Sequence, residues 1–354
     1  CGGHVAERLG PRSGMRIGAG LTSIALCGMS MVATSLPELL GFVAVGGVGN
    51  AVGQPAVNLY LTQRVRAGSL GLAFGIKQAA IPTAAVIGGL AVPALALTVG
   101  WRWAYGVAGL ATIAIALAVP ASAPKPPVGR RPFHRYGDLH LSLLALLALG
   151  HGLGSGAAGT LGAFLVSSAV DSGFGEGAAG VFGAGCAASG IVARVASGAM
   201  ADRRRSHHLT TVAAMLLLGS LALVALAVGA PPVMAVGGVG AYCLGWGWPG
   251  LLNFAIVQAN PGAPAAATSI TQTGAYLGGL LGPLAFGLTA QRWSYSAAWS
   301  AAAVVMAAAA GTVFAAHKLL RPTPSAELGG HPDLARPSRP CQCVRQSVSQ
   351  TEAT

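Results

Sequence analysis

The sequence predicts an all-α membrane protein, a polytopic helical bundle with about ten transmembrane helices. Only 8% of its 354 residues are charged, whereas an ordinary soluble domain has about 25%. Ten stretches stay apolar for roughly the 20 residues that a helix needs to cross the hydrocarbon core. Basic residues gather in alternate connections between these stretches, as they do on one side of a membrane protein.

Each apolar stretch must be helical, because lipid offers no partner for a free backbone N–H or C=O group. The stretches are 15–34, 37–61, 70–97, 101–121, 141–166, 178–200, 209–228, 233–256, 266–290 and 296–316. A basic, proline-rich connection at 122–140 divides them into four before it and six after it. Residues 321–354 are polar and contain several Pro and Ser, which predicts a disordered tail.

The basic residues also predict an orientation. Seventeen of the 21 Lys and Arg residues fall in the terminal segments and in alternate loops of one side, which we assign to the cytoplasm. Only Arg102 and Arg292 fall on the other side. We therefore expect a multi-pass protein of the plasma membrane with both ends of the sequence in the cytoplasm. Despite the net charge of +12, nucleic-acid binding is not expected, because no basic face with interleaved aromatic residues occurs.

Several short matches, in the same order and at nearly the same spacing, relate the two parts of the chain. The segment AVGGVG at 44–49 recurs at 235–240, and Gln78 aligns with Gln272 at a spacing of 194 residues. Matched loops lie on the same side, which is typical of two parallel six-helix halves. This predicts an incomplete N-terminal half at 1–121, a central cytoplasmic loop at 122–140, a C-terminal half at 141–320 and the tail at 321–354.

Two loop segments, GGHVAERLGPR at 2–12 and SGAMADRRR at 197–205, resemble the cytoplasmic signature of the major facilitator superfamily. In the first, Glu7 replaces the usual Asp. The resemblance covers 1–320 and implies helices 3–12 of a two-half architecture, with the first two helices missing. It also implies a monomeric secondary transporter, a symporter or antiporter coupled to a proton or another ion, which needs no cofactor and is not an enzyme. Because the family's antiporter pattern is matched poorly around Pro82, the direction of transport stays open.

On this resemblance, the signature loops supply gating residues, because an acid and a base at helix ends can hold one face closed. The predicted gating residues are Glu7, Arg8, Arg194, Asp202 and Arg203. The alternative is that the arginines of these loops only anchor the topology.

Polar residues within the apolar stretches are the candidate solute-binding residues, because such groups are costly in lipid. They are Asn50, Gln54, Asn58, Lys77, Gln78, His151, Trp248, Asn253 and Gln272. Asn50, Gln54 and Asn58 recur every four residues and form a polar stripe. Lys77 either lines a cavity or extends its long side chain to the membrane surface, and His151 either contacts the solute or a proton or packs in the bundle.

None of the nine acidic residues lies deep in an apolar stretch. Three explanations stay open: the proton-carrying carboxylate lies in the missing helices, His151 carries the proton, or the solute itself is an anion. We expect a small organic solute, either anionic or polar.

Two rival functions are an inactive truncated transporter and a membrane-embedded enzyme, although no clustered catalytic motif supports the second. No metal site is expected, because Cys341 and Cys343 form only a lone pair of thiols.

Overall fold

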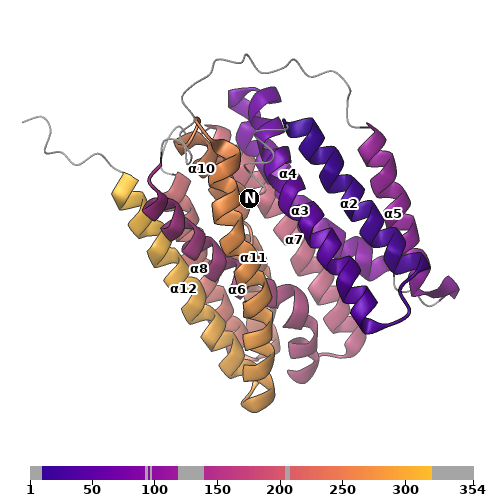
Figure 1. Cartoon of the computed structure of the whole chain (residues 1–354). Helices are drawn as coiled ribbons and strands as arrows, with labels where there is room; N and C mark the ends of the chain where they lie inside the picture. Colours follow the sequence, from indigo (N-terminus) through magenta and orange to yellow (C-terminus); the bar gives the residue numbers. More distant parts are fainter. Residues whose placement is uncertain (1–9, 92–94, 96–97, 119–138, 204–207, 321–354) are drawn as a thin grey trace, which may run out of the picture. The chain divides into compact units, whose positions relative to one another are not determined.

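The computed structural model describes residues 10–91, 95, 98–118, 139–203 and 208–320, and no strand occurs in these ranges (Figure 1). The helices are α2 (Pro11–Met31), α3 (Leu36–Arg64), η1 (Ala67–Ser69), α4 (Leu70–Ala91), α5 (Trp101–Ala118), α6 (Leu141–Asp171), α7 (Glu176–Arg203), α8 (His208–Val228), α9 (Pro231–Gly240), η3 (Ala241–Gly245), α10 (Pro249–Ala259), α11 (Pro264–Arg292) and α12 (Tyr295–Leu320). Each predicted apolar stretch coincides with one or two of these helices, which confirms the all-α fold.

In the described ranges, seven helices are long and apolar enough to cross a membrane, judged by length and composition alone: α3, α4, α5, α6, α7, α8 and α12. The helices α9 and α10 are each far shorter than the roughly 20 residues that a span needs. They cover one predicted stretch between them. Most of the predicted central loop and all of the predicted tail lie outside the described residues.

The prediction of one continuous helix over 233–256 is wrong, because a π-helical turn and a short non-helical link separate α9 from α10. Proline alone does not explain the break, since Pro55 and Pro283 lie inside continuous helices. Here Pro249, which lacks an N–H group, closely follows Gly245 and Gly247. Glycine is unfavourable inside a helix, so the combination favours a break at this point. The Nε1–H of Trp248 donates a hydrogen bond of 2.7 Å to the carbonyl of Gly245. This bond satisfies a backbone group that the break frees from the helix.

Glycines allow α6 and α11 to pack backbone against backbone. Gly152 and Gly156 of α6 face Gly274, Gly278 and Gly282 of α11. A Cβ atom added to Gly278 would overlap the carbonyl oxygen of Gly152. Close approach through small residues is how helices associate in lipid, where the hydrophobic effect does not drive them together.

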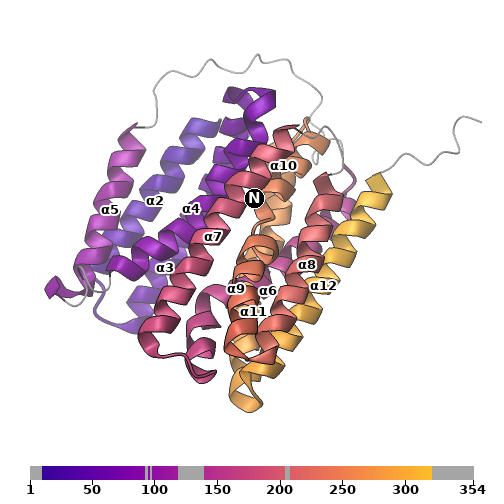
Figure 2. The same ribbon diagram turned by 180° about the vertical axis from the view of Figure 1, so that it is seen from behind.

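The helices pack in two groups, and a few helices of each group form the contacts between them. The helix α2 packs on α3 and α5, whereas α6 packs on α11 and α12, and α8 packs on α9 and α12. Between the groups, α4 packs along α7 and also contacts α10 (Figure 2). The helix α3 contacts α11. The boundaries predicted for the two halves, 1–121 and 141–320, stay a prediction.

Two ends of the bundle are distinguished by their charges. We call the end with Arg64, the start of α4 and Arg203 the basic end. The end with Arg102 and Arg292 is called the opposite end. Both views show the start of α4 and the end of α10 at the same end of the bundle (Figures 1 and 2).

Candidate functional site

Five residues from five parts of the chain meet inside the bundle: Asn58, Lys77, His151, Trp248 and Thr271. The Nζ atom of Lys77 donates a hydrogen bond of 2.7 Å to Oδ1 of Asn58. The imidazole of His151 packs edge-on against Trp248, with ring centroids 5.2 Å apart and an interplanar angle of 71°. It also lies against the backbone of Thr271 and within electrostatic range of Lys77. We call these residues the central polar cluster; they come from α3, α4, α6, the break before α10 and α11.

Two side chains of the central polar cluster, His151 and Lys77, have polar atoms or N–H groups that no described residue bonds. The Nδ1 atom of His151 is buried and has no partner among the described residues. The ammonium group of Lys77 has three N–H donors, and its bond to Asn58 uses one of them. In the described ranges no carboxylate pairs with Lys77: the acids there are Glu38, Asp171, Glu176 and Asp202, all at helix ends. The cluster can therefore donate hydrogen bonds to a further group rich in acceptors.

The polar stripe on α3 leads into this cluster. Asn50 is exposed, Gln54 is half-buried, and Asn58 is only 2% exposed. At the exposed end, Nδ2 of Asn50 donates a hydrogen bond of 3.1 Å to the hydroxyl of Tyr276 on α11. Since Asn58 is the member nearest to the basic end, the stripe becomes buried towards that end.

Arg194 of α7 joins α4 to the break in the α9–α10 segment. Its Nε–H donates a hydrogen bond of 2.9 Å to the carbonyl of Trp246, and Nη1 donates to the carbonyl of Gln78. The guanidinium carbon lies 5.2 Å from the centre of the Trp246 ring, a cation–π distance. Arg194 is 1% exposed, so it is bonded within the bundle and does not extend to a membrane surface.

Asp202 closes the contact between α4 and α7 at the basic end. Its carboxylate accepts hydrogen bonds from the backbone N–H groups of Gly71 at 2.7 Å and Leu72 at 2.8 Å. These groups lie in the first turn of α4, where N–H groups lack helical partners and the helix dipole is positive. Next to this contact, a Cβ atom on Gly198 would overlap the backbone of Gly71. The basic end is therefore tightly packed between these two helices.

For the other predicted gating residues, Glu7, Arg8 and Arg203, the described part of the structure shows no hydrogen bond between helices. Arg203 is exposed at the end of α7, next to Asp202. Glu7 and Arg8 lie outside the described residues. The gating role of all these residues stays a prediction.

Several predicted binding residues do not join the central polar cluster. Gln78 is bonded to Arg194 through its backbone carbonyl, and Gln272 is half-buried on α11. Asn253 is fully buried, and neither atom of its amide has a hydrogen-bond partner in the described part of the chain. Trp248 is fully buried as well, whereas the neighbouring Trp246 is half-buried. Trp248 belongs to the central polar cluster because its ring packs against His151.

Sequence reasoning missed two residues of this region, Thr271 and Tyr276. Tyr276 lies four residues after Gln272 and therefore on the same face of α11, which is a signal that could have been used. Thr271 has no such signal, because threonine is common inside helices of this protein. Its hydroxyl bonds to backbone carbonyls of its own helix, so only its backbone faces His151.

Comparisons with known proteins agree with this architecture. The family model described as Major Facilitator Superfamily matches residues 1–239. The fold is similar to the fucose:proton symporter FucP of E. coli, with a TM-score of 0.66 and 16% identity over 91% of this chain and 87% of that one. It is also similar to the proton:xylose symporter XylE (TM-score 0.67, 14% identity, 89% and 82% covered). A third similar structure is the human organic anion transporter MFSD10 (TM-score 0.65, 16% identity, 88% and 79% covered). No curated protein matches the sequence.

Proposed function

Because the chain belongs to the major facilitator superfamily, we propose that it transports a small organic anion, which binds at the central polar cluster. Members of this family are multi-pass membrane proteins with a site between two parallel groups of helices. Rocking of the two groups around that site exposes it to one side of the membrane at a time. We place the protein in the plasma membrane with its basic end in the cytoplasm, following the distribution of Lys and Arg.

One observation carries the proposal of an anion: Lys77 has a neutral amide as its hydrogen-bond partner and no described carboxylate near it. A charged side chain in the middle of a membrane helix costs about 2.5–3.5 kcal/mol on insertion scales. Asn58, its partner, is buried, so the ammonium group points into the bundle and not towards a membrane surface. An anionic solute would supply the missing negative charge.

His151 suggests how transport is coupled to an ion gradient. Protonation of His151 would place a second positive charge beside Lys77, and an anion would then bind more tightly. By linkage, the bound anion would favour the protonated form of His151 by the same free energy. We therefore propose a proton as the coupling ion. Two of the similar structures are proton symporters and a third is an organic anion transporter, which is compatible with this proposal.

The test replaces Lys77 by glutamine, which keeps a polar side chain and removes the charge. Binding of small mono- and dicarboxylates to the purified protein is expected to weaken by roughly 10- to 100-fold, because a hydrogen bond to a charged group contributes about 1.5–3 kcal/mol. Isothermal titration calorimetry would measure the affinities. Uptake of the same compounds into proteoliposomes, with and without a proton gradient, would measure the coupling.

The control is Lys318→Gln, because Lys318 is exposed at the end of α12 and contacts only the ring of Phe314 in the described structure. It should leave both affinity and uptake unchanged. Carboxylate binding that is equally strong in the wild type and in Lys77→Gln would contradict the proposal, as would a wild type that binds neutral sugars alone.

A further inference from the structure

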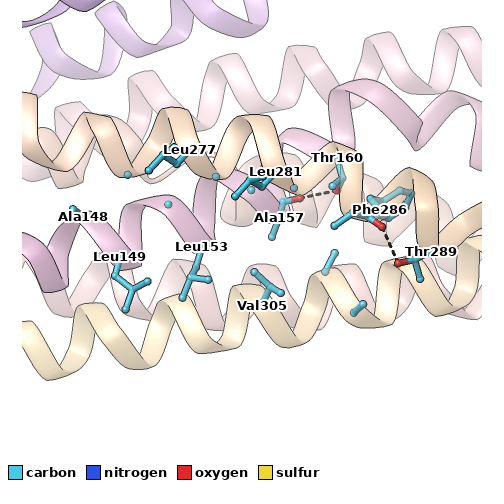
Figure 3. Close-up of a pocket in the computed structure, with 18 of the residues that line it drawn as sticks. Ala148, Leu149, Leu153, Ala157, Thr160, Leu277, Leu281, Phe286, Thr289 and Val305 are labelled. Carbon is cyan, nitrogen blue, oxygen red and sulfur yellow. Dashed lines mark hydrogen bonds between the residues drawn. The ribbon is translucent and has the colours of Figure 1, made fainter.

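A cavity of about 540 Å³ lies between α6, α11 and α12, and neither Lys77 nor His151 lines it (Figure 3). Three of the side chains that line it are polar: Thr160, Thr273 and Thr289. Each of these hydroxyls donates a hydrogen bond to a carbonyl of its own helix, at 2.7, 3.0 and 2.8 Å respectively. The walls therefore offer no free donor to a ligand, so the cavity suits a hydrocarbon chain.

The cavity is reachable from the membrane. Leu149, Leu277 and Leu281 line it and are 52%, 56% and 60% exposed. In a membrane protein, exposed leucines in the middle of helices face lipid tails. We call this cavity the lateral groove, because it opens towards the bilayer and not towards the central polar cluster.

The lateral groove is longer than one leaflet. Along α6 its lining runs from Ala148 to Thr160, roughly 18 Å, and along α11 from Ile270 to Thr289, roughly 28 Å, at about 1.5 Å per residue. Half of a hydrocarbon core of about 30 Å is about 15 Å. The groove can therefore hold the whole of one acyl chain from the leaflet in which it begins.

A positive charge lies beyond one end of the lateral groove. On α11 the lining residues repeat at spacings of three and four, ending with Ala285 and Thr289, so the next position on this face is Arg292. Arg292 is exposed, and no described residue bonds to it. Trp293, which follows it, is 72% exposed, and tryptophan is enriched at membrane–water interfaces.

The second arginine of the opposite end is engaged elsewhere. The Nη2 atom of Arg102 donates a hydrogen bond to the carbonyl of Ala33, and its guanidinium stacks on the ring of Trp101. Among the described residues of this end, Arg292 is therefore the cation that is available to a phosphate. It stands where the headgroup of a lipid in the groove would lie.

We propose that the lateral groove binds a phospholipid of the leaflet at the opposite end. One acyl chain lies between α6, α11 and α12, and its phosphate is bound by Arg292. The lipid contacts α11, the helix that also supplies Tyr276 and Thr271 to the region of the central polar cluster. The lipid site does not depend on the proposed solute, because it uses other residues.

The test titrates the purified full chain with phosphatidylglycerol and counts bound lipids by native mass spectrometry. Ala301 lines the groove and is exposed, so Ala301→Trp fills the groove and is expected to weaken lipid binding by about tenfold or more. Ala308→Trp is the matched control, because Ala308 is an exposed alanine of the same helix that does not line the groove. It should bind lipid like the wild type.

The headgroup is tested separately. Arg292→Gln is expected to weaken binding of phosphatidylglycerol by about fivefold, and Arg292→Lys to restore most of the affinity. Equal lipid binding by Ala301→Trp and the wild type would overturn the groove site. Equal binding by Arg292→Gln and the wild type would overturn the phosphate contact. Since the readout is lipid binding, failure of this proposal is distinguishable from failure of the proposed transport function.

Discussion

A Gly278→Ala variant is expected to lose about 3 kcal/mol of its free energy of unfolding, near the upper end of the usual cost of overpacking. The added Cβ atom would overlap the carbonyl oxygen of Gly152. A flexible side chain could rotate out of the way, but here the opposing atoms belong to the backbone of α6. The two helices must therefore separate along their glycine contact. Unfolding in mixed micelles with increasing SDS would measure the loss.

The control for this prediction is the next residue, Gly279. A Cβ atom there meets nothing within 4 Å, and alanine in a helix is favoured over glycine by roughly 0.5–1 kcal/mol. Gly279→Ala should therefore be as stable as the wild type or slightly more stable. Equal stability of the two variants would show that the contact between α6 and α11 tolerates a larger separation than the structure indicates.

The positions of the helices were predictable because lipid imposes one requirement on every segment. Each backbone hydrogen bond must be satisfied within the segment, so hydropathy alone locates the helices to within a few residues. The break before α10 was not predicted, because it depends on three-dimensional contacts. Trp248 bonds to Gly245, the ring of Trp248 packs against His151, and the ring of Trp246 packs against Arg194. Proline gave no reliable signal, since Pro55 and Pro283 leave their helices intact.

The candidate site was predictable as a set of residues but not as an arrangement. Lys77 and Asn58 were both candidate solute-binding residues, and for Lys77 an extended position at the membrane surface was the alternative. Their hydrogen bond joins α3 to α4, and no pattern in a single sequence shows which sides of two helices face each other. Arg194 was predicted to be a gating residue together with Asp202. Its partners are the carbonyls of Gln78 and Trp246, and every residue has a carbonyl, so the sequence carries no signal for this contact.

An Asp202→Asn variant is expected to shift the protein towards conformations that are open at the basic end. The carboxylate accepts two backbone N–H bonds at the start of α4, whereas an amide has one oxygen and would turn its N–H group towards the second donor. Loss of one charge-assisted bond, worth about 1.5–3 kcal/mol, changes a two-state equilibrium by roughly 10- to 100-fold. Electron–electron resonance between spin labels at Gly68→Cys and Met200→Cys in a cysteine-free background would measure the opening.

The comparison with Glu38→Gln separates a gate from an ordinary helix cap. The carboxylate of Glu38 also accepts two backbone N–H bonds, from Thr34 at 2.7 Å and Ser35 at 3.2 Å, but these belong to the turn just before its own helix. Its loss weakens the start of α3 and connects no separate helices, so the distances at the basic end should not change. Because both substitutions remove the same chemical group, a longer label distance in Asp202→Asn alone must come from the bridge between α4 and α7. Unchanged distances in both variants would leave Asp202 as a cap and place the gate elsewhere.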